Sequence, residues 1–248
     1  MAANAALANV LMAGFMASEG LPVSVSIVLA LLVSTAIGAV NGYLVAFLEL
    51  DAFIITLGMF TLLGGAVTWY TNGQIIQGVP DSIGNLSTVR FGVMPVTFIV
   101  FIVIAAVIWY MHEQTPFGRR LESIGSNERA ARLVGVSVRR HKFMTLLLSG
   151  LFSGVAGLLI VINQGSGDPA VGPSYLFPAV TAIFLGATSI RPGKFNVPGT
   201  IVAVFFLAVA INGLSLMGVS SWITPVFNGG GLILAVVLST LLRRAHAK

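Results

Sequence analysis

Long stretches of this 248-residue sequence contain no charged side chain. The stretches without Asp, Glu, Lys or Arg are 1–18, 20–48, 52–80, 91–112, 143–167, 169–190 and 195–242. A helix needs about 20 mostly apolar residues to cross the hydrocarbon layer of a bilayer, which is roughly 30 Å thick. Only 8% of the residues are charged, whereas a soluble domain carries about 25%. The sequence therefore predicts an all-α, polytopic membrane protein and excludes a soluble globule or a disordered chain.

The uncharged stretches accommodate about eight transmembrane spans. The stretch 195–242 is long enough for two crossings, and Gly218 to Pro225 supplies a turn between them. We expect spans near 3–18, 22–47, 52–71, 93–111, 143–163, 174–190, 197–217 and 226–242. They form a bundle that we interpret as a single transmembrane domain over residues 1–248.

The basic side chains predict the orientation of the bundle. The loop 112–142 contains seven of them: Arg119, Arg120, Arg129, Arg132, Arg139, Arg140 and Lys142. Short loops rich in Lys and Arg lie on the cytoplasmic side. Alternation from this loop puts both termini, together with Arg191 and Lys194, in the cytoplasm. The net charge of +5 is then a topology signal, and we expect no nucleic-acid partner.

The same loop is predicted to contain a short capped helix. Ser126 or Asn127 can cap the N-terminus of a helix over residues 128–134, with Glu128 at its positive end. Gly135 is placed to end that helix. A short rigid helix on the cytoplasmic side suits docking to another protein, and an ordinary solvated basic loop is the alternative.

Two further features of the loop concern its boundaries and its surface. Pro116 and Gly118 are expected to end the preceding helix. Ala130 and Ala131 keep one side of the short helix small, so that another surface can approach it closely.

The segment Glu128-Arg-Ala-Ala-Arg-Leu-Val-Gly135 resembles the E-A-A-three-residues-G loop of bacterial ABC importer permeases. More segments are similar, in the same order, to the ribose/xylose/galactoside branch of that family. They are Val40-Asn-Gly-Tyr-Leu-Val45, Phe53-Ile-Ile-Thr-Leu-Gly58, Thr115-Pro-Phe-Gly-Arg-Arg120, Ile124-Gly-Ser-Asn127, Ala130-Ala-Arg-Leu-Val-Gly-Val136, Leu185-Gly-Ala-Thr-Ser189, Gly199-Thr200 and Ile211-Asn-Gly-Leu214. The resemblance covers nearly the whole chain.

This resemblance implies a permease subunit of a binding-protein-dependent ABC importer for a monosaccharide in the bacterial inner membrane. It implies a second permease subunit, identical or different, a cytoplasmic ABC ATPase and a periplasmic sugar-binding protein as partners. The short helix would be a coupling helix that docks in the ATPase through Glu128, Ala130, Ala131 and Gly135, helped by the charges of Arg129 and Arg132. The chain itself would be no enzyme and would need no cofactor or metal.

The sequence departs from the family in two places. Family members usually have further membrane helices ahead of this region, and their second membrane helix contains an Asp-Leu-Ser-Val-Gly-like motif. The resemblance therefore implies that the N-terminal part of this chain is truncated or mis-started. Many sugar permeases carry an acidic residue where this chain has Leu176 and Phe177. The particular sugar is left open.

Neutral polar residues inside the spans are candidates for the substrate pathway, because hydroxyls and amides suit an uncharged sugar. The candidates are Asn41, Thr56, Tyr175, Thr181 and Asn212. For each, the alternative is an interhelical hydrogen bond, worth roughly 0.6 kcal/mol on average. The glycines of Gly150-x-x-x-Gly154 likewise predict close helix packing, either within the chain or at the seam of a permease dimer.

Two alternative functions remain from the sequence. A secondary carrier or channel would need no ATPase, but the spans lack the ionisable residues that couple transport to protons. A truncated remnant that inserts without transporting is the other. An enzyme is disfavoured, since no phosphate-binding loop and no catalytic set is found.

Overall fold

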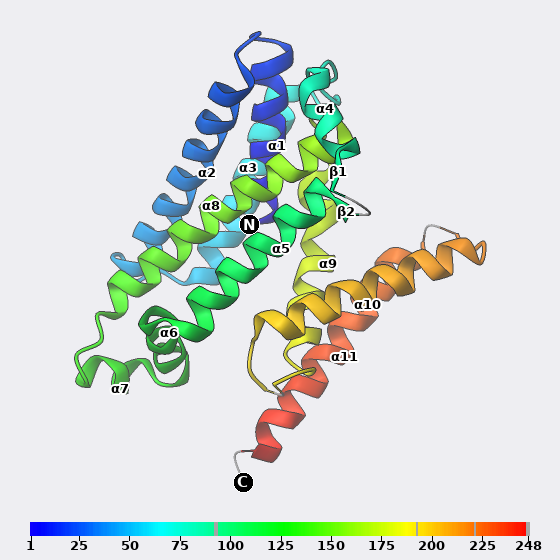
Figure 1. Ribbon diagram of the computed structural model, residues 1–248. Coiled ribbons are helices and arrows are strands. Elements are labelled where there is room, and N and C mark those ends of the chain that lie inside the picture. The colour runs from blue at the N-terminus through cyan, green and yellow to red at the C-terminus, as the bar shows by residue number, and fades with distance from the viewer. Residues whose placement is uncertain (92–93, 192, 221, 247–248) are drawn as a thin grey trace. The chain divides into compact units, whose positions relative to one another are not determined.

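The computed structural model describes residues 1–91, 94–191, 193–220 and 222–246 (Figure 1). Apart from one short hairpin, the elements of these residues are helices. The chain divides into two compact units, Met1–Pro173 and Ser174–Lys248. Each unit is described by itself, and the single domain over 1–248 stays a prediction.

Helices occur at all eight positions predicted as spans, which confirms the all-α class. They are α1 (Ala2–Ala17), α2 (Val23–Ala46), α3 (Ala52–Thr71), α5 (Val96–Trp109), α8 (Val138–Gln164), α9 (Val171–Gly186), α10 (Val197–Leu216) and α11 (Ile223–His246). Helix α5 continues as a π-helix, η1 (Tyr110–Gln114). By length and composition α2, α3, α5 with η1, α8 and α10 can cross a membrane, whereas α1, α9 and Ile223–Leu238 are shorter apolar helices.

Several short elements were not predicted from the sequence. The connection between α3 and α5 contains α4 (Asp81–Thr88) and an antiparallel pair, β1 (Arg90–Phe91) and β2 (Met94–Pro95). The loop 112–142 contains α6 (Pro116–Ser126) before the expected short helix. Pro116 thus begins a helix rather than only ending one, because proline is tolerated in the first turn, where no backbone N–H is needed.

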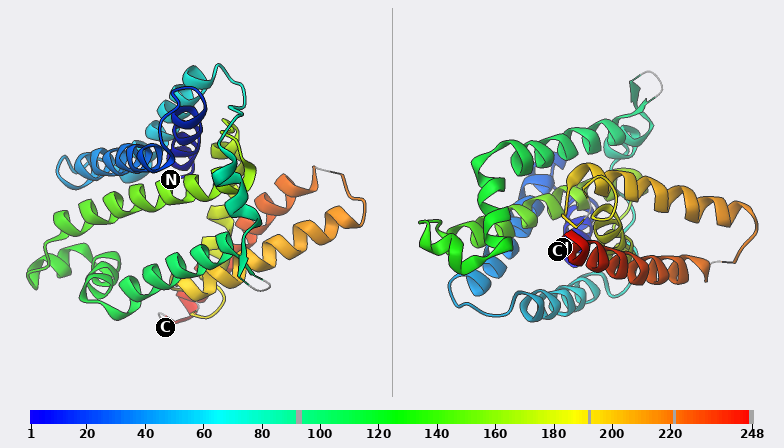
Figure 2. Two further views of the ribbon diagram at one scale, coloured as in Figure 1. Left: turned by 45° about the horizontal axis from the view of Figure 1, so that its top comes forward. Right: turned by 90° about the horizontal axis from the view of Figure 1, so that it is seen from below.

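The core of the first unit is built around α1. This helix packs against α2, α3 and α8 (Figures 1 and 2). Ala8, Val10, Met12 and Ala13 are completely buried. Small alanine side chains let the surrounding helices approach α1 closely, so a helix of low polarity can be enclosed on several sides.

Helices α2 and α8 cross in near backbone contact. A Cβ added to Gly150 would lie 2.6 Å from the Ser34 carbonyl oxygen and 2.7 Å from Gly38 Cα. One turn further along α8, a Cβ on Gly154 would meet Leu31 and Ser34 at 2.9 Å. The glycines of the G-x-x-x-G segment are therefore occupied within the chain. The structure favours internal packing and contradicts a dimer seam formed by Gly150 and Gly154.

A buried amide holds the segment that follows the C-terminal end of α8, the end remote from the loop 112–142. Asn9 on α1 is completely buried. Its Oδ1 accepts a hydrogen bond from the backbone N–H of Asp168 at 2.8 Å, and its Nδ2 donates to the Ser166 carbonyl at 3.3 Å. Ile76 and Gly167 exchange backbone hydrogen bonds of 2.9 Å across the same connection. The segment after α8 is thus held by α1 and by the residues that follow α3.

The second unit packs α10 against α11 and the C-terminal part of α9. Ala182, Ala203 and Leu207 form its buried cluster. Asn196 caps α10 by accepting from the Gly199 N–H at 2.7 Å. A Cβ on Gly186 would lie 2.5 Å from the Thr200 nitrogen, so glycine is needed where α9 meets the start of α10.

Candidate functional site: the coupling helix and its ion-pair network

The loop 112–142 contains the expected short helix, α7 (Glu128–Leu133). Asn127 caps it, since its Oδ1 accepts from the Ala130 N–H at 3.0 Å. Ser126, the other possible cap, instead donates to the Glu122 carbonyl within α6 at 3.0 Å. After α7 the chain turns at Gly135, whose φ is +83°. A side chain is rarely tolerated at this φ, so glycine permits the turn that joins α7 to α8.

Ala130 and Ala131, which were expected to let another surface approach α7, differ in their exposure. Ala131 is 3% exposed, so its small side chain packs within the chain and is not available to another protein. Ala130 is exposed. Leu133 and Val134, the residue directly after α7, are the most exposed large apolar side chains of the loop 112–142, at 89% and 78%. The exposed apolar surface at α7 therefore consists of Ala130, Leu133 and Val134.

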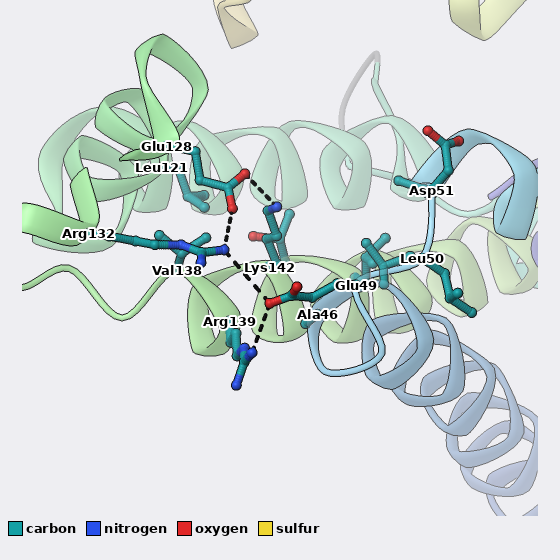
Figure 3. A pocket seen from close by; sticks show the side chains of 14 residues that line it. Ala46, Glu49, Leu50, Asp51, Leu121, Glu128, Arg132, Val138, Arg139 and Lys142 are labelled. Carbon is teal, nitrogen blue, oxygen red and sulfur yellow. Dashed lines mark hydrogen bonds and ion pairs between the residues drawn. The ribbon is translucent and has the colours of Figure 1, made fainter. Parts of the chain in front are cut away.

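Glu128 joins α7 to the start of α8. Its Oε1 accepts from Arg132 on the same helix at 2.7 Å, and its Oε2 accepts from Lys142 Nζ on α8, also at 2.7 Å (Figure 3). These bonds hold the pKa of the Glu128 carboxyl below its usual range, the Lys142 hydrogen bond being the largest cause. Glu128 therefore stays ionised at neutral pH and keeps α7 beside α8.

Glu49 extends this network to the connection between α2 and α3. Its Oε1 accepts from Arg139 on α8 at 2.8 Å and lies 4.0 Å from Arg132 Nη2 on α7 (Figure 3). Glu49 takes a positive φ of 55°. The Arg139 hydrogen bond lowers the pKa of the Glu49 carboxyl. The ends of α2, α7 and α8 are thus linked by five charged side chains from separate parts of the sequence.

The network borders a pocket of about 530 Å³. Its apolar wall comes from the ends of α2 and α8, and Asp51 lies at its edge (Figure 3). Asp51 also caps α3, since its Oδ1 accepts from the Phe53 and Ile54 N–H groups at 2.9 and 3.0 Å. The start of α3 therefore follows directly after the ion-paired Glu49.

The remaining sequence candidates are divided between the two units, and each is described within its own unit. Asn41 on α2 has a buried Oδ1 with no hydrogen-bond partner, while Thr56 donates to the Ala52 carbonyl of its own helix at 2.7 Å. In the second unit, Thr181 is completely buried and donates to the Phe177 and Asn228 carbonyls at 2.8 and 3.0 Å. Tyr175 is 50% exposed, and Asn212 donates to its own helix. Within each unit, and among the described residues, no side-chain hydrogen bond joins two of these candidates.

A polar junction inside the first unit was missed by the sequence analysis. Asn4 on α1 donates to the Ser34 carbonyl at 3.1 Å and to the Gly150 carbonyl at 3.4 Å. The Oδ1 of Asn4 and the hydroxyl of Ser34 are buried and have no partner among the described residues. Only the spatial meeting of three helices reveals this junction, since nothing local distinguishes either residue.

The family is established by comparison with known proteins. The family described as "Branched-chain amino acid transport system / permease component" matches residues 1–236. The chain belongs to this permease family. The ribose import permease protein RbsC of Bacillus subtilis is 35% identical over 235 residues, which cover 94% of this chain and 73% of that protein. RbsC of Haemophilus influenzae is 32% identical, covering 93% of this chain and 72% of the relative.

A second group of relatives consists of permeases named for autoinducer 2 import. The autoinducer 2 import system permease protein LsrD of Yersinia enterocolitica is 31% identical, with 94% of this chain and 72% of that protein covered. No solved structure matches the chain significantly. The matches confirm the resemblance to ABC importer permeases of the ribose type. The chain is a multi-pass membrane protein of a transport family, whose members work with an ATPase and a binding protein.

Proposed function

We propose that this chain is the membrane-spanning subunit of a monosaccharide importer driven by a separate ATPase. The ribose permeases among its relatives support the substrate class. The observation that carries the mechanism is the attachment of α7 to α8 and to the α2–α3 connection through Glu128 and Glu49. A secondary carrier needs no such exposed helix, and the spans predicted from the sequence hold no Asp, Glu, Lys or Arg for it to use. The chain is then a transport subunit and no enzyme.

The loop 112–142 lies in the cytoplasm in this proposal, and so do both termini. An ATPase contacts the exposed face of α7, where Leu133 and Val134 present apolar surface and Ala130 permits close approach. Arg129 is exposed on the same helix and adds charge at the rim. Such central apolar side chains surrounded by polar ones are typical of protein interfaces.

The network then carries the movement of α7 into the bundle. Because Glu128 and Arg132 bridge α7 to Lys142 and Glu49, a displacement of α7 moves the start of α8 and the α2–α3 connection together. Ala131 contributes by packing within the chain, and Gly135 by the turn that joins α7 to α8. In this proposal, ATP binding in the partner moves α7, and α7 moves the start of α8 and the α2–α3 connection.

The substrate side of the proposal requires a second permease subunit and a periplasmic sugar-binding protein. Asn41 is the best supported pathway residue, because its buried and unpartnered amide oxygen is free to accept from a sugar hydroxyl. Thr56, Tyr175, Thr181 and Asn212 stay candidates. Thr181 already makes two hydrogen bonds, so a structural role is as well supported for it.

The test is uptake of labelled ribose, xylose and galactose by vesicles that contain the chain with its ATPase and binding protein. We expect uptake to require ATP and to be abolished by Leu133→Asp, together with loss of ATPase retention on the purified complex. Leu133 is 89% exposed, so this variant leaves the fold of the chain intact. Ser123→Asp is the matched control, since it places the same charge on exposed α6. Gradient-driven uptake without the ATPase, or normal uptake by Leu133→Asp, would refute the proposal.

A further inference from the structure

A second pocket lies between α6, the start of η1 and the first turns of α8. Its volume is about 430 Å³, within the range of roughly 300–1,000 Å³ that is usual for ligand sites. It is lined by Met111, Phe117, Arg120, Ser137, Arg140, His141, Met144, Leu147 and Leu148. It shares no lining residue with the pocket beside the ion-pair network.

The pocket is basic at one end and apolar at the other. Arg120 on α6 and Arg140 on α8 both line it, and neither has an ion pair within the described ranges. Leu147 and Leu148 lie seven and eight residues further along α8, which corresponds to about 10–12 Å at 1.5 Å per residue. Such a lining suits an occupant that is anionic at one end and hydrocarbon at the other.

Phe117 and His141 form part of the wall of this pocket and contact each other. The rings of Phe117 and His141 are stacked, with centroids 5.7 Å apart and planes at 21°. His141 is 7% exposed, and its Nδ1 lies 2.8 Å from the Ser137 carbonyl oxygen. The stacking of Phe117 on His141 joins α6 to α8. The shape of the pocket is therefore supported by contacts between these two helices.

The neighbouring aromatic residues place the pocket at the surface of the membrane. Trp109 and Tyr110, which directly precede Met111, are 37% and 60% exposed. Exposed Trp and Tyr at the end of a membrane helix mark the headgroup level. Basic pockets between membrane helices at the cytoplasmic face suit anionic lipid headgroups.

We propose that this pocket binds an anionic phospholipid of the cytoplasmic leaflet. Arg120 and Arg140 pair with the headgroup phosphate, and one acyl chain runs along Met144, Leu147 and Leu148. The lipid lies against both α6 and α8, so it steadies the loop that carries α7. This inference rests on the cytoplasmic placement of the loop 112–142 in the proposed function. A tag accessible only from the opposite side of the membrane would overturn that placement, independently of any lipid measurement.

The experiment is lipid binding to the purified full chain in detergent, followed by native mass spectrometry during titration with dioleoyl phosphatidylglycerol or dioleoyl phosphatidylcholine. The wild type is expected to retain one phosphatidylglycerol in preference to phosphatidylcholine. Arg120→Gln combined with Arg140→Gln should weaken that binding about 30-fold, about fivefold for each arginine near the headgroup layer. Arg120→Lys with Arg140→Lys should keep most of the affinity, since the charges remain.

The matched control is Arg119→Gln with Arg129→Gln, which removes two charges from the same loop outside the pocket. It should bind phosphatidylglycerol like the wild type. Equal weakening by both double variants, or no preference for the anionic lipid, would overturn the proposal in favour of general surface attraction. Displacement of the lipid by millimolar inorganic phosphate would overturn it in favour of a soluble anion.

Protein stability and assembly give two further readouts. Phosphatidylglycerol should raise the Tm of the wild type and not that of the Gln double variant, whose Tm without lipid should be unchanged because both arginines are exposed. If the Gln variant bound lipid normally but lost its ATPase or second permease, the pocket would be a protein interface and the lipid assignment would be wrong.

Discussion

Replacing Gly150 by alanine tests the crossing of α2 and α8 directly. The added Cβ would lie 2.6 Å from the Ser34 carbonyl oxygen, whereas ordinary van der Waals contacts begin at 3.4 Å. Both nearest atoms belong to the backbone of α2, so no side chain can rotate away. The two helices must therefore separate locally by about 0.8 Å, the difference between those two distances. The Gly150 carbonyl, which accepts from Asn4, moves with them.

The expected cost follows from two opposing effects. Overpacking of a close-packed interior destabilises by typically 1–3 kcal/mol. Alanine in place of glycine within a helix recovers roughly 0.5–1 kcal/mol. We expect a net destabilisation of about 1–2 kcal/mol, or a fall in Tm of a few degrees at 2–4 °C per kcal/mol for a chain of this size.

Thermal unfolding of the purified protein in detergent measures this change, with Gly64→Ala as the matched control. A Cβ on Gly64 in α3 meets nothing within 4 Å, so this variant should be neutral or stabilised by roughly 0.5–1 kcal/mol. Gly38→Ala should separate the same two helices from the α2 side. The double variant with Gly150→Ala should therefore lose less stability than the sum of the two single variants. A Gly150→Ala protein as stable as Gly64→Ala would refute the close crossing.

Three more predictions concern α7 and the turn that follows it. Asn127→Ala removes the cap on the Ala130 N–H and should destabilise α7 by about 1 kcal/mol, seen as faster hydrogen exchange of its amides. Gly135→Val places a β-branched side chain at a φ of +83° and should leave ATP hydrolysis intact while uptake is lost; normal uptake would contradict the role of this turn. Because the pKa of Glu128 is lowered, its bond to Lys142 should be complete above the ordinary Glu pKa of about 4.3 and lost as the pH falls through the lower folded value. The protection of the α7 amides, measured relative to their intrinsic exchange rate at each pH, should therefore fall at acid pH in the wild type and show no such fall in Glu128→Gln.

The membrane helices could be predicted closely because hydropathy alone defines them. The expected span 52–71 coincides with α3, and 197–217 differs from α10 by one residue. A continuous apolar run needs no tertiary information to be recognised. Helix α6 was missed because it is short and amphipathic; its only signals are Pro116 in the first turn and the spacing of Phe117 and Leu121.

The candidate site could be predicted only in part. The cap and the end of α7 follow from local chemistry at Asn127 and Gly135, and both are found in the structure. The buried side of a helix of six residues depends on what packs against it, so the sequence could not show that Ala131 faces inward. The ion pair of Glu49 could not be predicted from the sequence, because its partner Arg139 lies 90 residues away.

The close packing of α8 is not confined to Gly150. A Cβ on Gly42 of α2 would lie 3.0 Å from Phe143 near the start of α8, and a Cβ on Gly157 would lie 2.6 Å from the Ala5 carbonyl oxygen of α1. Asn9 of α1 also holds the segment directly after α8. A displacement at the α7 end of α8 should therefore be shared by α1 and α2, so that these three helices move as one rigid group.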